Sequence, residues 1–225
     1  MPRRKSRKLS ELSSLPNVIS EETIRTHGGL RACFDVARPL IMDVGCGKGE
    51  HAVELARRRP DHNIVGVDLK GARLHAAASQ AIAEGVSNIA FLKIEWRRIP
   101  SLVTTPETDE AWLLFPDPHP KQREAHRRLT SRKNLGVFQR LLKPWAKIHL
   151  RTDSRSFLEF TEKQVRDLGG RILSHRIGVA HDLPSEDDLS IHTTYEKRFR
   201  EEGREIEYLC FSLPEPTLSM AEIRT

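Results

Sequence analysis

The sequence has few cysteines and no long apolar run, and both absences narrow its possible class. Its three cysteines, Cys33, Cys46 and Cys210, lie far apart and form neither a disulfide framework nor a CxxC metal pair. No HExxH or comparable ligand spacing occurs, so we expect no metal site. No apolar stretch approaches the roughly 18 residues needed to span a bilayer, and the amino terminus lacks the apolar segment of a signal peptide. We therefore expect a reduced, cytoplasmic compartment and no membrane partner.

The length and composition suit one folded domain. The chain has 225 residues, of which 38% are hydrophobic, enough for one complete core. The first 20 residues are polar and basic without a sustained period, so we predict a flexible basic arm over residues 1–20 and a single domain over 21–225. The sequence leaves open whether the protein is a monomer or a homodimer.

Positive charge is concentrated in two places. The chain carries 37 Lys and Arg against 31 Asp and Glu, a net charge of +6. Five of the first eight residues are basic, and residues 121–133 hold six Lys or Arg against the single acid Glu124. Clusters of this kind attract polyanions by releasing condensed counterions. The alternative is a solvated face and a frayed tail.

From about residue 38, predicted strands and helices alternate. The expected strands are 40–44, 63–68, 89–94, 110–115, 146–151, 171–178 and 205–213. The expected helices are 50–59, 72–84, 134–142 and 154–168, with a short one at 195–202. Such alternation predicts an α/β fold, a doubly wound, mostly parallel seven-stranded sheet with helices on both faces. Ligands of such sheets bind beyond the carboxyl ends of the strands.

A glycine-rich segment follows the first expected strand. It reads Asp43-Val44-Gly45-Cys46-Gly47-Lys48-Gly49-Glu50. We expect Gly45, Gly47 and Gly49 to line a cofactor, because alternate glycines allow a tight turn and close approach of the backbone. A dinucleotide fingerprint would have glycine in place of Glu50, whose carboxylate would also repel a pyrophosphate. S-adenosylmethionine has no phosphate, so the segment favours that cofactor.

Carboxylates stand at the ends of the first three strands. Asp43 suits the cationic amino-acid end of the cofactor, and Asp68 can accept hydrogen bonds from both ribose hydroxyls. The alternative is that both acids only cap the helices that follow. Glu95, after the third strand, is either a contact of the adenine amino group or an ordinary surface acid.

The fourth expected strand exits into an acidic loop that contains three prolines. Its sequence is Phe115-Pro116-Asp117-Pro118-His119-Pro120-Lys121. The prolines fix the backbone and remove donors, so the loop is stiff. Stiffness is useful here if Asp117 must be placed accurately beside the cofactor. His119 is a stacking or polar contact, or is simply exposed.

Basic and polar residues share the edge of the sheet with this loop. The basic run 121–133 follows it directly, which favours a nucleic-acid substrate whose base enters near Asp117. The phosphates would then lie on Lys121, Arg127 and Arg128. Further candidates at this edge, each of which taken singly could equally belong to a helix cap, are Asp153, Thr193, Tyr195 and Glu196.

Three motifs in order resemble the tRNA guanine-N7 methyltransferase family, over about residues 43–206. The most specific is F-P-D-P-x-P-K…R-R-L, present at 115–121 and 127–129. The T-D after the fifth strand is present at 152–153, and T-x-[YF]-E-x-R-F is present at 193–199. The chain departs from the family pattern at His119, where a Trp is usual, at Gln122, where a basic residue is usual, and at Glu95, where Asp is common.

The resemblance implies a class I, Rossmann-like methyltransferase that uses S-adenosylmethionine and acts on a guanine in the tRNA variable loop. It implies cofactor contacts at Asp43, Asp68, Glu95 and Asp117. It also implies substrate contacts at Lys121, Asp153 and residues 193–196.

Guanine N7 presents a lone pair, so no general base is required. We expect Asp117 to orient the guanine and to offset the positive charge that develops on it. Two alternatives remain: a small-molecule methyltransferase, which the basic edge disfavours, and a non-catalytic RNA-binding protein, which the glycine segment and acids disfavour. A nicotinamide-dependent oxidoreductase is a more distant alternative because of Glu50.

Overall fold

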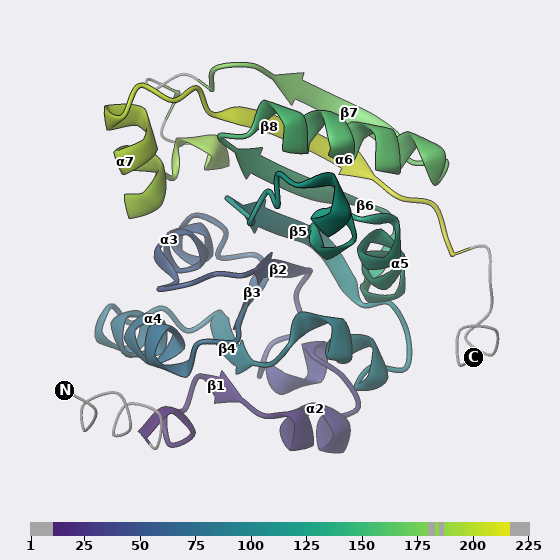
Figure 1. Cartoon of the computed structure of the whole chain (residues 1–225). Helices are drawn as coiled ribbons and strands as arrows, with labels where there is room; N and C mark the ends of the chain where they lie inside the picture. Colours follow the sequence, from purple (N-terminus) through teal and green to yellow (C-terminus); the bar gives the residue numbers. More distant parts are fainter. Residues whose placement is uncertain (1–10, 180–182, 185–186, 217–225) are drawn as a thin grey trace.

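One eight-stranded sheet forms the centre of the molecule (Figure 1). The computed structural model describes residues 11–179, 183–184 and 187–216. The strand order is β1-β4-β3-β2-β5-β6-β8-β7, and only β8 runs antiparallel to its neighbours. The strands are β1 (Val18–Ile19), β2 (Leu40–Val44), β3 (Asn63–Asp68), β4 (Ile89–Lys93), β5 (Thr108–Leu114), β6 (Leu142–Thr152), β7 (Arg171–Arg176) and β8 (Glu207–Ser212).

Helices cover both faces of this sheet. Figure 1 shows α3 and α4 on one face and α2, α5 and α6 on the other. The α-helices are α2 (Glu21–His27), α3 (Glu50–Arg58), α4 (Gly71–Ala83), α5 (Arg132–Leu141), α6 (Arg155–Asp167) and α7 (Thr194–Glu201). Short 3-10 turns are η1 (Arg31–Cys33), η2 (Trp96–Ser101), η3 (Gln122–Arg127) and η4 (Asp188–Ser190). The predicted doubly wound α/β fold is confirmed.

The sheet has one strand more than the seven expected. Strand β1 pairs in parallel with β4, with Val18 opposite Phe91. Two residues are too few to show an alternating pattern, which explains why the sequence did not indicate this strand. Residues 1–10 of the expected arm lie outside the described residues. Its remainder, 11–20, carries β1 and a Leu12 that is only 4% exposed.

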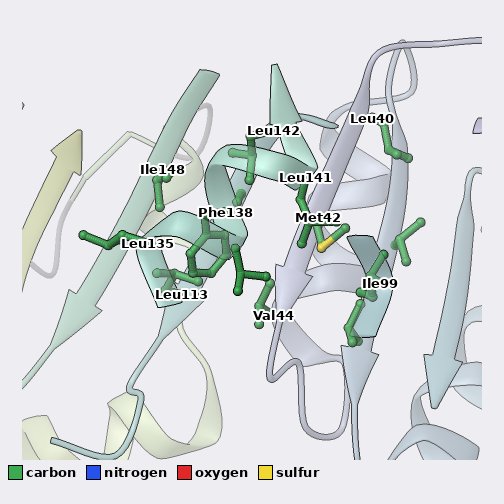
Figure 2. Packing of buried hydrophobic residues seen from close by; sticks show 14 of the residues in the cluster. Leu40, Met42, Val44, Ile99, Leu113, Leu135, Phe138, Leu141, Leu142 and Ile148 are labelled. Carbon is green, nitrogen blue, oxygen red and sulfur yellow. The ribbon is translucent and has the colours of Figure 1, made fainter. Parts of the chain in front are cut away.

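Alternation along β2 divides its side chains between two cores. Leu40, Met42 and Val44 pack with residues of α5 such as Phe138, as Figure 2 shows. Ile41 joins the second core, which includes side chains of α3 and α4. Because successive side chains on a strand point to opposite faces, Asp43 lies on the same face as Ile41, toward α3.

A stack of aromatic and polar rings lies within the second core. The Trp112 and His149 rings are parallel to within 6° with centroids 4.1 Å apart, and His149 Nδ1 shares a hydrogen bond of 2.8 Å with the Tyr208 hydroxyl. Burial, reinforced by the nearby charge of Lys147, lowers the pKa of His149 to about 3. His149 Nε2 stands 3.4 Å from Glu110 Oε1 without forming a hydrogen bond, and with its lowered pKa the ring is neutral near pH 7.

The neutral His149 makes stability depend on pH. Between pH 6.5 and about 3 the unfolded chain binds a proton at this residue that the folded chain lacks, so the free energy of unfolding falls as the pH falls. The contribution is up to about 1.4 kcal/mol per pH unit. His149→Phe should remove it, so in urea titrations from pH 7 to pH 4 the variant should lose less stability than the parent. Tyr208→Phe keeps the imidazole and should keep the parent's slope. Parallel curves for His149→Phe and the parent would contradict the assignment.

Candidate active site

The glycine segment forms an open turn over the end of β3. The Gly45 and Cys46 amides donate to the Val67 carbonyl at 2.8 and 3.1 Å. Gly45 has φ 81° and Gly47 φ 60°, and a Cβ at either would meet no atom closer than 4.0 Å. Backbone there is therefore exposed to a ligand. Gly49 differs from the expectation, because a Cβ there would lie 2.5 Å from Ala77 Cβ; it allows α3 and α4 to pack closely.

Asp68 fastens the end of β3 to this turn. Its Oδ2 accepts from the Gly47 amide at 3.0 Å, and its Oδ1 accepts from the Lys70 amide at 2.7 Å. Helix α3 has Gly49 at its N-cap and α4 has Lys70, neither with a side-chain cap bond. The alternative in which Asp68 only caps a helix is therefore wrong. Each carboxylate oxygen retains a second lone pair for a ligand hydroxyl.

Asp43 is a buried carboxylate with one free oxygen. The residue is 1% exposed, and its Oδ2 bonds to His51 Nδ1 at 3.0 Å. Its Oδ1 has no hydrogen-bond partner among the described residues. A buried carboxylate oxygen without a donor is costly, so this atom calls for a cation or donor from a ligand.

The electrostatics of the turn are negative. Burial raises the pKa of the Cys46 thiol well above its ordinary value, and the charges of Asp43 and Asp68 raise it further. Cys46 is therefore a neutral thiol rather than a nucleophile. A cationic ligand fits these surroundings.

Glu95 lies at the same edge, at the start of η2. Its Oε1 accepts from Arg97 Nε at 2.6 Å, and its side chain is 30% exposed. The geometry thus resembles a surface ion pair, and a contact of Glu95 with adenine remains a prediction.

The acidic loop combines an exposed carboxylate with a strained backbone. The Asp117 side chain is 72% exposed, and its Oδ1 accepts from the His119 amide at 3.1 Å. Phe115 has φ 49° and His119 φ 40°. Such values are uncommon for non-glycine residues and persist only where the surroundings enforce them. The loop therefore presents Asp117 in an enforced conformation.

Arg128 holds the loop in that conformation by hydrogen bonds to its backbone. Its guanidinium donates to the Pro118 carbonyl at 3.1 Å and to the His119 carbonyl at 3.1 and 3.2 Å. It also lies over the Phe160 ring at 4.4 Å, and the residue is 6% exposed. Nε and Nη2 of Arg128 are therefore committed to the loop, and this buried placement does not favour the expected contact of Arg128 with phosphate. Lys121 and the 58%-exposed side chain of Arg127 stay accessible.

The late motif forms the start of α7, with a buried acid. Thr193 is the N-cap, and its hydroxyl accepts from the Glu196 amide at 3.2 Å. Glu196 is fully buried and pairs with Arg151 and with Arg200, the latter at 2.7 Å. Glu196 therefore anchors α7 through its Oε1, while its Oε2 has no hydrogen-bond partner among the described residues, and its expected contact with the substrate remains a prediction. Tyr195 is 53% exposed.

Asp153 lies at the end of β6, as expected, and is paired. Its Oδ2 accepts from Arg204 at 2.7 Å, and its side chain is 18% exposed. A substrate contact would have to share or displace this exposed arginine.

Helix α7 contacts both the residue that follows the glycine turn and the acidic loop. Glu50 Oε1 accepts from the Thr194 hydroxyl at 2.8 Å, and Glu50 Oε2 accepts from the Thr194 amide at 2.5 Å. The Phe115 and Phe199 rings meet edge to face at 5.5 Å. Glu50 at the start of α3 thus caps α7, and the acidic loop packs against the same helix.

Comparisons with known proteins identify the family. The model of a family described as "Putative methyltransferase" matches residues 37–209. The tRNA (guanine-N(7)-)-methyltransferase of Christiangramia forsetii is 36% identical, over 80% of this chain and 81% of that protein. The same-named protein of Porphyromonas gingivalis is 35% identical, over 84% of this chain and 77% of that protein.

The chain belongs to the tRNA guanine-N7 methyltransferase family. This confirms the resemblance and the predicted enzyme class. A solved structure shares the fold: a mutant of the 16S rRNA (adenine(1408)-N(1))-methyltransferase of Catenulisporales acidiphilia with its cosubstrate S-adenosylmethionine. Its TM-score is 0.58 at 16% identity, covering 90% of this chain and 95% of that chain. S-adenosylmethionine, the methyl donor of this class, fits the open glycine turn and the buried carboxylate oxygen described above.

In residues 11–179, 183–184 and 187–216, no group of three His, Cys, Asp or Glu is placed to hold a metal ion. None of the helices in these ranges has the length and apolar character that crossing a membrane requires.

Sequence reasoning missed three residues that organise the site: His51, Glu50 as a cap, and Arg151. A histidine in the first turn of a helix, such as His51, gives no signal by itself, because its partner is known only from the packing. The Glu50–Thr194 contact joins residues 144 apart in sequence. For the late motif at 193–199, the sequence left open that a residue caps a helix, and Thr193 is indeed the N-cap of α7.

The Glu50 cap should be measurable as order in α7. Glu50→Ala removes both acceptors of Thr194, and loss of a helix cap costs about 1 kcal/mol. Amide hydrogen exchange over residues 194–199 should therefore quicken about fivefold in the variant. Glu54→Ala, on the same helix α3 but paired with Arg57 and Arg58, is the matched control and should leave α7 unchanged. Unaltered exchange in Glu50→Ala would show that the cap does not order α7.

Proposed function

We propose that this chain transfers a methyl group from S-adenosylmethionine to N7 of a guanine in tRNA. The observation that carries the proposal is the strained, proline-rich loop that presents Asp117 beside an open glycine turn, with a basic run directly after it. The family resemblance points to the tRNA variable loop. We further propose a single-domain, cytoplasmic enzyme, monomeric or homodimeric, since tRNA is a cytoplasmic substrate.

Three acids and the glycine turn serve the cofactor. Asp43 Oδ1 receives the ammonium group of the amino-acid end, because it is the buried oxygen without a donor. Asp68 accepts from the ribose hydroxyls through the lone pairs that Gly47 and Lys70 leave free. Glu95 reaches the adenine amino group once Arg97 is shared or displaced.

Asp117 orients the guanine. When bound, the cofactor supplies an electrophilic methyl carbon on a sulfonium. Guanine N7 attacks with its own lone pair, so no residue of this chain needs to remove a proton. Asp117 accepts hydrogen bonds from the guanine edge and offsets the positive charge that develops on the ring. Its 72% exposure leaves the carboxylate open to an incoming base.

The RNA backbone lies along the basic run. Lys121 and Arg127 contact phosphates, whereas Arg128 holds the loop from inside. Asp153, Thr193 and the exposed ring of Tyr195 lie across from this basic run, on the other side of the entrance through which the guanine reaches Asp117. The Arg198 guanidinium lies 5.5 Å from the Tyr195 ring centroid, so a ring and a cation are available together to an unstacked base.

The primary test identifies the product. Purified protein is incubated with radiolabelled S-adenosylmethionine and bulk unmodified tRNA, and the labelled nucleoside is identified after digestion. Labelled 7-methylguanosine supports the proposal. Cofactor binding without label in tRNA would favour a small-molecule acceptor. Binding of tRNA without cofactor binding would favour a non-catalytic RNA-binding protein.

Asp117→Asn tests the orienting carboxylate. Loss of its charge should lower the methylation rate on the order of a hundredfold. The shape of the pH–rate profile should not change, because no proton transfer depends on Asp117. Asp61→Asn, an exposed acid before β3 at the opposite edge of the sheet, should be as active as the parent. Full activity of Asp117→Asn would refute the role.

Arg127 and Arg128 separate phosphate binding from support of the loop. Arg127→Ala should flatten the log–log salt dependence of tRNA binding by about 0.7–0.9, the value of one lost phosphate contact. Arg128→Lys keeps the charge but loses the planar fork, so it should lower kcat and leave the salt slope unchanged. Arg127→Lys is the matched control and should change neither quantity. A flattened slope in Arg128→Lys would restore Arg128 as a phosphate contact.

A further inference from the structure

Asp43 is oriented by a residue that no motif of the sequence singled out. His51 lies on the first turn of α3, is 1% exposed, and meets Asp43 Oδ2 through its Nδ1 at 3.0 Å. A carboxylate offers only acceptors, so the Nδ1 of His51 carries the hydrogen. This hydrogen bond engages one carboxylate oxygen and leaves the other, Oδ1, for a ligand.

The His51 ring is itself held by packing. Its centroid lies 4.7 Å from the Trp112 ring, which stacks in turn on His149. Its Nε2 has no hydrogen-bond partner among the described residues. Nδ1 and Asp43 therefore provide the only hydrogen bond of this imidazole within the described part of the chain. If His51 served packing alone, neither ring nitrogen would need a hydrogen-bond partner, whereas Nδ1 has one in Asp43.

We propose that His51 is a positioning residue for the amino-acid end of the cofactor: it fixes the Asp43 side chain so that Oδ1 faces the ammonium group. The inference rests on the proposed use of S-adenosylmethionine. Without the Nδ1 donor, the Asp43 carboxylate is free to rotate, and neither oxygen is presented in a fixed direction.

The structure also explains why His51 can do this. Asp43 is on the face of β2 toward α3, and the glycine turn between them brings the first turn of α3 back over the strand end. Gly49 has φ 75°, and a Cβ there would clash with Ala77 of α4, so this glycine sets how closely the start of α3 packs against α4. The donor and the carboxylate are eight residues apart in sequence, and this turn brings them together.

Three ligands measure the proposed effect in binding rather than in turnover. S-adenosylmethionine and S-adenosylhomocysteine carry the amino-acid end, and 5′-methylthioadenosine lacks it. Titration calorimetry on His51→Phe should show the first two binding about tenfold or more weaker, the value of one lost hydrogen bond to a charged group. The affinity for 5′-methylthioadenosine should stay within about twofold of the parent's.

Two further variants separate positioning from packing. His51→Asn places an amide donor near the position of Nδ1, so it should restore most of the lost affinity. His149→Phe disturbs the same stack on Trp112 but bonds Tyr208 rather than Asp43 in the parent, so it should not change the ligand preference. Equal weakening of all three ligands in His51→Phe, or His51→Asn binding as weakly as His51→Phe, would overturn the proposal. Parent protein that binds none of the three ligands would refute the proposed function instead.

The tautomer gives a test that needs no variant. Nitrogen-15 NMR of the parent should show a hydrogen on Nδ1 of His51. The opposite tautomer would overturn the proposal even if His51→Phe fails to fold.

Discussion

The parallel alignment of β2 between β3 and β5 is the constraint on which the rest of the structure depends. Val44 pairs with Val67 on one side and with Leu113 on the other, so the three strands end at one level. The glycine turn, Asp68 and the acidic loop consequently emerge at the same edge of the sheet. The alternation of side chains along β2 then decides that Asp43 points toward α3 and His51, while its neighbours enter the opposite core. A shift of one residue in this register would move Asp43 to the other face.

Residues in the recurring motifs divide into those that face the entrance and those that hold them in place. Asp117 and Tyr195 are exposed, whereas Arg128 and Glu196 are buried: Nε and Nη2 of Arg128 donate to loop carbonyls, and Oε1 of Glu196 accepts from arginines. A buried ion pair is a poor source of net stability, since desolvation offsets much of the attraction. These buried groups instead fix orientation. Glu196 fixes the first turn of α7, and Arg128 fixes the Pro118 and His119 carbonyls of the strained loop. A motif thus identifies a site without telling which of its members touch the ligand.

The sequence predicted the sheet well because buried parallel strands are short, mostly apolar segments, as in 40–44 and 63–68. It missed α2, although Ser20 caps its start, two acids follow and Gly28 ends it in the left-handed conformation. Those signals are local and could have been used. The partners of Arg128 and Glu50 could not, because they are set by which loops meet after folding. The carboxylates at strand ends were predictable from topology, but the orphaned oxygen of Asp43 required the packed structure.

The charges of the site suit a reaction in which a positive charge changes place. Burial raises the pKa of the Cys46 thiol, and the negative charges of Asp43 and Asp68 raise it further; the described chain gives Asp43 Oδ1 no donor. A site of this kind favours binding of a cationic ligand. In methyl transfer to a neutral nitrogen, the positive charge leaves the sulfur and appears on the guanine ring. We propose that Asp117 lies beside the guanine, where its stiff loop would hold the carboxylate in place without reorganisation. In the proposed function, the two groups of carboxylates therefore act on different charges: Asp43 and Asp68 hold the methyl donor before transfer, and Asp117 stabilises the acceptor as transfer proceeds.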